Sequence, residues 1–203
     1  MRIQACFTLA LVLAVRPAVG QSTADARLVV TGHNPEGRAI VVSDDRPPNV
    51  MRFETLPGYE ITSLWSTRSG EDGGLASGES VIGDGTLVPG PGGTHLLLFR
   101  LPSPSELAAA TEMGSTPETI LQEFRAKAPD LAASADLETG LHTTPTVDYV
   151  IVLTGSVLMA LDDGAVVTLG PGDVVVQNGT AHAWYNGGDE GAVLAAVMVG
   201  GQP

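Results

Sequence analysis

Three side chains in the C-terminal half of the chain have the types and the order to transfer protons. His142 stands near the start of the stretch GLHTTPTVDYVIVLTGSV (residues 140–157), Asp148 lies within it, and His182 follows later. The whole chain contains four histidines. An imidazole changes its charge near neutral pH, so it can act as a general base or a general acid on a bound substrate. His142 and His182 are therefore the predicted catalytic residues.

These side chains can act together only if the fold brings them to one cavity. Residues of equal parity on a β-strand point to the same side of the sheet. His142, Thr144 and Asp148 would therefore share one face, which the following valines continue into the apolar interior. His182 and Trp184 share a face on their own strand. If both faces point inward, the two histidines and the carboxylate converge.

Short apolar runs, separated by turn residues, make up the C-terminal part of the chain. Between residues 147 and 200 these runs are VDYVIVLTG, SVLMALDDG, AVVTLGPGD, VVVQNGT, AHAWYNGG and AVLAAVMVG. Parallel strands need a crossover of a dozen residues or more, which the turns between these runs cannot supply. The spacing therefore predicts antiparallel strands in a jelly roll or a small barrel. Earlier strands are predicted in RLVV, RAIVV, MRFE, ITSLW and THLLLFRLP, with one more short strand at residues 80–82.

A segment at residues 104–135 interrupts the strand pattern with helix formers. Ser115 or Thr116 can cap a helix that begins with a proline, a residue that fits the first turn. Ile120, Leu121 and Phe124 then fall on one face of this helix. We expect two short helices here, inserted between strands.

The block from residue 140 to residue 186 resembles the cupin superfamily, whose double-stranded β-helix carries two short motifs. At the positions of the first motif this chain has Gly140, His142, Thr144, Asp148 and Gly155. The second motif is matched by Gly172, Asp173, Gly179, His182 and Asn186. The resemblance implies an all-β fold, a cupin-type jelly roll or double-stranded β-helix barrel, with the short helical insertion at about residues 104–135. It also implies that residues 27–203 form a single cupin domain.

The resemblance also bears on metal binding. Cupins with a full metal site offer two histidines and a glutamate in the first motif and a third histidine in the second. In this chain Thr144 stands in place of the second histidine and Asp148 in place of the glutamate. The resemblance therefore implies a divalent metal, Fe, Mn, Zn or Ni, held by His142, Asp148 and His182. His95 is an additional candidate, since it could replace the ligand that is lost at Thr144.

Three functions stay open at this point. The first is an enzyme that acts on a small molecule and uses the metal for dioxygenase-, isomerase- or lyase-like chemistry. The second is a metal-free lyase or isomerase in which His142 or His182 carries the proton. The third is a non-catalytic module that binds a ligand. Trp184 could line the pocket in each case and stack on an aromatic substrate.

The charge of the chain argues against one class of partner. Asp and Glu number 23 against 10 Lys and Arg, which gives a formal net charge of −13. Such an acidic surface repels phosphate backbones and anionic lipid headgroups. We therefore expect no nucleic-acid partner, and the resemblance to cupins implies a small-molecule substrate. The resemblance to cupins implies a homodimer, and the strands before the helical insertion are the candidates for adding to a partner's sheet.

Residues 1–20 are predicted to be a signal peptide. Arg2 precedes an apolar run at residues 5–15, and small residues with the spacing of a cleavage site end at Gly20. The run is too short to span a bilayer of about 30 Å. We expect an exported protein, periplasmic or secreted, without a membrane contact after cleavage. Cleavage would also remove Cys6, the one cysteine of the chain.

Overall fold

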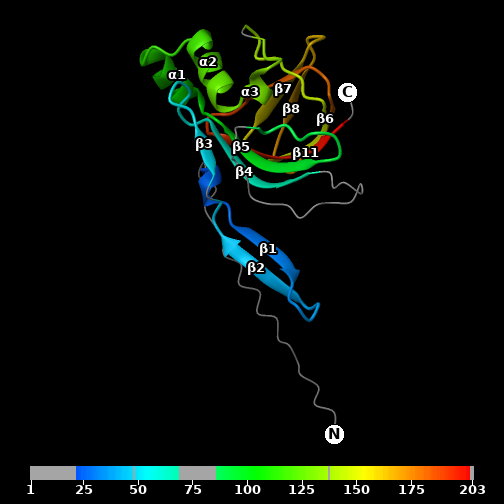
Figure 1. The fold of residues 1–203 in the computed structure, drawn as a ribbon. Helices are drawn as coiled ribbons and strands as arrows, with labels where there is room; N and C mark the ends of the chain where they lie inside the picture. Colours follow the sequence, from blue (N-terminus) through cyan, green and yellow to red (C-terminus); the bar gives the residue numbers. More distant parts are fainter. Residues whose placement is uncertain (1–21, 48, 69–85, 137, 202–203) are drawn as a thin grey trace.

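Two antiparallel β-sheets face each other and hold the core between them (Figure 1). The computed structural model describes residues 22–47, 49–68, 86–136 and 138–201. The strands of these two sheets are β3 (Val50–Arg52), β4 (Glu60–Thr67), β5 (Thr94–Leu101), β6 (Thr146–Thr154), β7 (Val157–Leu161), β8 (Val166–Leu169), β9 (Val174–Asn178), β10 (His182–Asn186) and β11 (Ala192–Gly200). The larger sheet has the order β3, β4, β5, β11, β6, β9, and the smaller sheet has the order β10, β7, β8.

The arrangement of these strands confirms the predicted all-β jelly roll of cupin type. Every run that was expected to be a strand within the described ranges forms one, and the paired strands are antiparallel. Phe99 and Val152 of the larger sheet and Met159 of the smaller one belong to the same core cluster. Backbone hydrogen bonds between the described residues do not close the sheets into a continuous barrel. Instead, an isolated bridge joins His142, ahead of β6, to His182 on β10.

Strand β6 shows how the hydrophobic pattern sets the direction of the site residues. Val150 is 4% exposed and Val152 is 1% exposed, whereas Tyr149 is 46% and Leu153 is 44% exposed. A slip of the strand by one residue would turn its whole apolar set toward water, so the burial of one face fixes the register. Asp148 has the parity of Val150 and is carried inward with it.

Three helices, one more than expected, follow β5 and lie together beside the sheets (Figure 1). They are α1 (Pro104–Glu112), α2 (Pro117–Lys127) and α3 (Pro129–Ala132). Of the two expected caps, Ser115 and Thr116, it is the side chain of Thr116 that caps α2, and it accepts a hydrogen bond from the N–H of Thr119. Proline cannot continue the hydrogen bonds of a preceding helix but fits a first turn. Pro129 therefore ends the α2 segment and starts the short third helix.

The N-terminal strands form a separate sheet that projects from the rest of the described chain (Figure 1). A 3₁₀ turn, η1 (Thr23–Asp25), precedes the hairpin of β1 (Leu28–His33) and β2 (Ala39–Asp45). The predicted signal peptide and the strand expected at residues 80–82 lie outside the described residues. In the part of the chain that the structure describes, no helix is long and apolar enough to cross a membrane.

Candidate functional site

The backbone pairs His142 with His182 and so places two imidazoles side by side. The N–H of His142 donates to the carbonyl oxygen of His182 at 3.0 Å, and the N–H of His182 donates back at 3.1 Å. In such an antiparallel pair the Cα atoms lie about 5.5 Å apart and the side chains project from the same face. The ring centroids are accordingly 4.5 Å apart, with an interplanar angle of 50°. The structure thus brings together the two histidines that the sequence singled out.

Each of these imidazoles is oriented by a hydrogen bond at Nδ1. Nδ1 of His142 lies 3.2 Å from the carbonyl oxygen of Gly140, and Nδ1 of His182 lies 2.8 Å from that of Thr180. A carbonyl oxygen only accepts hydrogen bonds, so these contacts assign the proton to Nδ1 in both rings. Nε2 is then the nitrogen with the lone pair, which can accept a proton or bind a metal.

Burial keeps both imidazoles neutral at pH 7. It lowers the pKa of His142, and the adjacent ring of His182 lowers it further, against the opposing effects of Gly140 and Asp148. His182 is 4% exposed. Burial lowers its pKa as well, despite the hydrogen bond to Thr180. Both rings are therefore in the form that accepts a proton.

Asp148 lies on the same inward face with one carboxylate oxygen unpaired. Its Oδ2 accepts a hydrogen bond from Oγ1 of Thr144 at 3.3 Å, and that hydroxyl lies 2.7 Å from Oγ1 of Thr146. Oδ1 is buried and has no hydrogen-bond partner among the described residues. Burial raises the pKa of Asp148, although Thr146, Thr144 and the nearby His142 partly oppose this effect.

The site residues line one small cavity of about 80 Å³. Among its walls are His142, Thr144, Asp148, His182 and Trp184. The indole of Trp184 stands edge-on to the imidazole of His182, with centroids 5.5 Å apart and an interplanar angle of 76°. Thr144, which replaces a motif histidine, keeps its place in the cavity as a hydroxyl that bonds to Asp148. Trp184 forms a wall of the pocket, as the sequence indicated.

The structure does not bring His95 to this site. On β5 it pairs with Met198 of β11, whose partner on β6 is Asp148. Two strand spacings separate His95 from Asp148, a distance of about 10 Å. Nδ1 of His95 lies 2.7 Å from the carbonyl oxygen of Leu87, and its Nε2 lies 2.6 Å from Oγ of Ser63. Both ring nitrogens are engaged and the ring lines a different cavity, so His95 does not supply the missing ligand.

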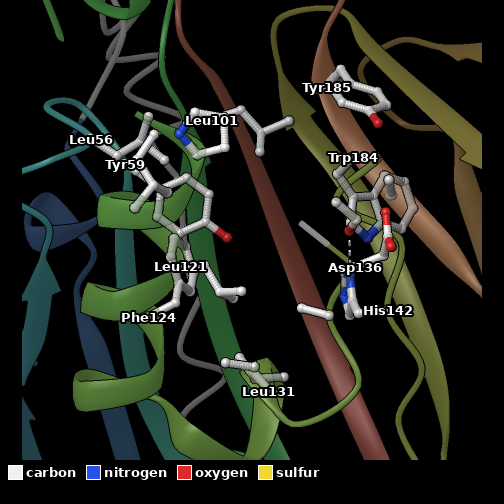
Figure 2. A pocket seen from close by; sticks show the side chains of 16 residues that line it. Leu56, Tyr59, Leu101, Leu121, Phe124, Leu131, Asp136, His142, Trp184 and Tyr185 are labelled. Atoms are coloured by element: carbon white, nitrogen blue, oxygen red, sulfur yellow. Dashed lines mark hydrogen bonds between the residues drawn. The ribbon is translucent and has the colours of Figure 1, made fainter. Parts of the chain in front are cut away.

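A larger cavity adjoins the small one and was not foreseen from the sequence. It measures about 370 Å³ and is lined by residues of α2, α3 and β10 (Figure 2). The two cavities share Tyr59, Leu131, His142 and Trp184. Ile120, Leu121 and Phe124, which the sequence placed on one helical face, line this cavity from α2. Their spacing revealed an apolar face, but nothing in the sequence showed that this face borders the histidines.

The donors around the small cavity suit a divalent metal in type but not in spacing. Imidazole nitrogens and a carboxylate oxygen are ligands that transition-metal ions accept. In the described parts of the chain, however, no three or more His, Cys, Asp or Glu side chains lie close enough together to hold an ion. Metal binding by His142, Asp148 and His182 therefore stays a prediction.

Curated proteins with sequence similarity include fungal cupin-domain proteins, while no family model matches the chain. The cupin-domain-containing oxidoreductase fogC of Aspergillus ruber is 42% identical over 50 residues, 25% of this chain and 25% of that protein. The cupin-domain-containing oxidoreductase srdD of Neurospora crassa is 39% identical over 62 residues, 30% of this chain and 32% of that protein. Phomopsin biosynthesis cluster protein D of Diaporthe leptostromiformis is 45% identical over 49 residues, 24% and 26% of the two chains. The matched segment thus spans between about a quarter and a third of these relatives.

Solved structures with similarity to the chain include two whose names state the same fold. The cupin domain of Cnp3 from Schizosaccharomyces pombe has a TM-score of 0.42 and 9% identity, over 86% of this chain and 87% of that domain. A protein with a double-stranded β-helix domain from Klebsiella pneumoniae has a TM-score of 0.33 and 16% identity, over 54% of this chain and 69% of that one. Both likenesses are of low score, and they concern the fold alone.

Proposed function

On the premise that this chain has the cupin fold, we propose that it is an enzyme that acts on a small organic molecule. His142 and His182 carry protons in this reaction. The observation that carries the proposal is the backbone pair between them, which holds two neutral imidazoles 4.5 Å apart in one cavity. The Nδ1 hydrogen bonds leave both Nε2 atoms to the substrate.

Proton transfer by this pair accounts for two kinds of reaction. Nε2 of one imidazole takes a proton from a C–H or O–H group of the substrate and the ring becomes an imidazolium. Return of this proton to another atom of the same molecule completes an isomerisation, and its delivery to a leaving group completes an elimination. Asp148 raises the pKa of His142, so its carboxylate stabilises the imidazolium while the proton is held.

A divalent-metal enzyme is the second candidate, and the unpaired oxygen of Asp148 favours it. A buried carboxylate oxygen without a hydrogen bond destabilises the fold, and a bound cation would offset this effect. Its ligands would be His142, Asp148 and His182, which do not form a group able to hold an ion in this structure. A bound Fe, Mn, Zn or Ni ion would polarise a substrate oxygen or, if redox-active, activate dioxygen. The names of the relatives fogC and srdD, both cupin-domain-containing oxidoreductases, agree with this candidate.

Measuring turnover and metal content on the same protein preparation tests both candidate functions, proton transfer by the histidines and catalysis by a divalent metal. The protein is purified without chelator or nickel resin, and elemental analysis measures its metal content. A panel of carbonyl- and hydroxyl-bearing organic compounds is then screened for turnover by mass spectrometry, with and without EDTA. The variants are His142→Ala and His182→Ala. His33→Ala is the matched control, because His33 is exposed at the end of β1.

We expect both site variants to lose turnover by about 100-fold or more, because general acid–base groups contribute effects of this size. The control variant keeps its activity. Activity that survives EDTA supports proton transfer by the imidazoles, and activity that EDTA abolishes and a metal restores supports the second candidate. Unchanged turnover in both site variants would overturn the proposal. Ligand binding without turnover of any compound would overturn it as well, since it would make the protein a binding module.

A further inference from the structure

The cavity of about 370 Å³ lies directly beside the paired histidines. His142 and Trp184 line it on one side, and Tyr59, Leu121 and Phe124 line it on the other (Figure 2). Its volume falls within the range of about 300–1,000 Å³ that is usual for small-molecule sites. Because His142 belongs to both this cavity and the small one, a molecule in the larger cavity can reach the predicted base.

The lining of this cavity is apolar and offers no positive charge. Its apolar members include Leu56, Leu101, Ile120, Leu121, Phe124 and Leu131. No lysine or arginine is among the described residues that line it. Asp136 is also at the wall, and hydrogen bonds from the hydroxyl and the N–H of Thr139 lower the pKa of this carboxyl group. A carboxylate stays ionised there, so an anionic ligand meets repulsion and no counter-charge.

Tyr59 supplies a polar group inside the apolar walls. Figure 2 shows its hydroxyl pointing into the cavity, toward the side of Trp184 and His142. No partner for this hydroxyl is found among the described residues, whereas the N–H of Tyr59 donates to Leu56 at 3.0 Å. Its ring is held by edge contacts with Phe124, at a centroid distance of 5.1 Å, and with Phe53, at 5.3 Å. Burial raises the pKa of Tyr59, so the phenol remains a hydrogen-bond donor.

We propose that this cavity binds the substrate, an uncharged and mainly apolar organic molecule, and that Tyr59 donates a hydrogen bond to an oxygen of that molecule. The apolar walls bind the body of the molecule by burial, and the hydroxyl sets which end faces His142. The assignment of the bound molecule as the substrate rests on the proposed function, while the binding itself can be measured separately.

Three probes of one ring system test the charge and the oxygen. They are 2-naphthol, naphthalene and 2-naphthoate, titrated at pH 7 and followed by calorimetry or by ligand-observed NMR. We expect 2-naphthol to bind and 2-naphthoate to bind at least tenfold more weakly. In Tyr59→Phe, 2-naphthol should lose about three- to tenfold in affinity, the effect of one neutral hydrogen bond, and naphthalene should lose nothing.

Two further variants test whether the probes bind in this cavity. Tyr149→Phe is the matched control, because Tyr149 is exposed on the outer face of β6 and does not line the cavity. Its affinity for 2-naphthol should stay unchanged. Ile120→Trp fills the cavity from a half-buried position and should abolish binding of every probe. Equal binding of 2-naphthoate and 2-naphthol, or no effect of Tyr59→Phe, or unchanged binding in Ile120→Trp, would each contradict the proposal.

Titration of the same probes into His142→Ala distinguishes a failure of the binding proposal from a failure of the proposed function. We expect 2-naphthol to bind this variant even though turnover is lost, because the apolar walls and Tyr59 are intact. Turnover in the wild type without probe binding in this cavity overturns the inference and leaves the function standing. If the probes bind with the affinities expected above but turnover does not need the histidines, the proposed function is overturned and the inference about the cavity stands.

Discussion

At the scale of single residues, Asp148 is unfavourable for the stability of the fold but suited to a function. The side chain is 6% exposed, and one of its oxygens has no hydrogen-bond partner in the described structure. Burial of an unpaired charge is unfavourable, and proteins retain such groups mainly where they act on a ligand. If Asp148 had no function beyond filling its place in the fold, replacing it by an uncharged residue would stabilise the protein. Asp148 is therefore expected to work on a substrate, a proton or a metal ion.

Asp148→Asn tests this view through the pH dependence of stability. Burial raises the pKa of Asp148 above its unfolded value of about 3.9. The folded protein then binds the proton more tightly, so the wild type gains free energy of unfolding as the pH falls from 7 toward 4. Asparagine cannot take up this proton. The wild type should therefore become more stable relative to the variant on acidification, by about 1.4 kcal/mol for each unit by which the pKa is raised.

Urea unfolding at pH 7 and at pH 4.5 measures this difference in the two proteins. Asp162→Asn, which changes an exposed carboxylate in the β7–β8 hairpin, shows the background. A difference between wild type and Asp148→Asn that stays constant or shrinks on acidification would contradict the proposed burial of the charge.

At the scale of elements, the side chain of Glu123 links α2 to the chain ahead of β4. The carboxylate of Glu123 accepts hydrogen bonds from the N–H groups of Glu54 and Thr55, both at 2.8 Å. It also accepts from the hydroxyl of Thr55 and pairs with Lys127 one turn further along the helix. Burial alone would raise the pKa of Glu123, but these partners outweigh it and lower the pKa to about 2.

Glu123→Gln is expected to loosen α2 in a pH-dependent way. The pKa of Glu123 is lower in the folded state than its usual 4.5, so its contribution to stability is complete above about pH 4.5 and is lost as the pH falls toward 2. At pH 7 the variant should lose about 1–3 kcal/mol in free energy of unfolding, and less at pH 3. Urea unfolding at both pH values checks this. Glu112→Gln, an exposed glutamate of α1, serves as the control, and an equal loss in the two variants would refute the role of Glu123.

The sequence predicted the elements well because burial of one strand face leaves a period of two residues. Along β6 this alternation was enough to place Asp148 inside and Tyr149 outside. The odd or even position of a residue predicts only which face of the sheet its side chain is on, however, and not how many strands separate it from another residue. His95 shares a row of the larger sheet with Asp148, yet it lies two strands away and is bonded to Ser63.

Local sequence patterns could not predict the contacts between elements that are distant in the sequence. The pairing of His142 with His182 depends on the register between a segment ahead of β6 and the strand β10, which no period in either segment encodes. Tyr59 comes from a short turn-rich stretch and meets Phe124 only because α2 folds back on it. The metal expected at His142, Asp148 and His182 was inferred from the family motif and stays a prediction, since no three or more His, Cys, Asp or Glu side chains of the described residues form a group that could hold an ion.

At the scale of the whole molecule, the β1–β2 hairpin pairs with no third strand among the described residues. An isolated two-stranded hairpin is marginally stable in water. This one exposes several large apolar side chains, Val29 at 45%, Ile40 at 41%, Val41 at 59% and Val42 at 62%. Burial against a second copy of the chain would remove this surface from water, in line with the homodimer that the resemblance to cupins implies.

Sedimentation velocity at tens of micromolar protein tests the dimer. We predict a dimeric wild type and a double variant, Val41→Ser with Val42→Ser, whose dissociation constant is at least tenfold higher. Both residues are exposed, so the change spares the core. Val166→Ser, at an exposed valine of β8, should leave the dimer intact. A monomeric wild type would refute the prediction.

Export of the protein is likewise a prediction about the whole chain. The apolar run at residues 5–15 and the small residues that end at Gly20 predict cleavage close to Gln21. Intact mass spectrometry of protein from the periplasm or the medium should show a chain without the N-terminal segment and without cysteine. Full-length protein that remains in the cytoplasm of its own host would show that this interpretation is wrong.

The proposed function requires that His142 and His182 stand together as neutral imidazoles with Nε2 open to the cavity. Long-range ¹H–¹⁵N NMR of protein labelled at histidine reads the tautomer and the charge of each ring, and the two alanine variants assign the signals. At pH 7 both rings should be neutral with the proton on Nδ1, and they should titrate only below the usual pKa of about 6.5. A proton on Nε2 of either ring, or an imidazolium at pH 7, would contradict the proposed role of the two imidazoles as proton acceptors.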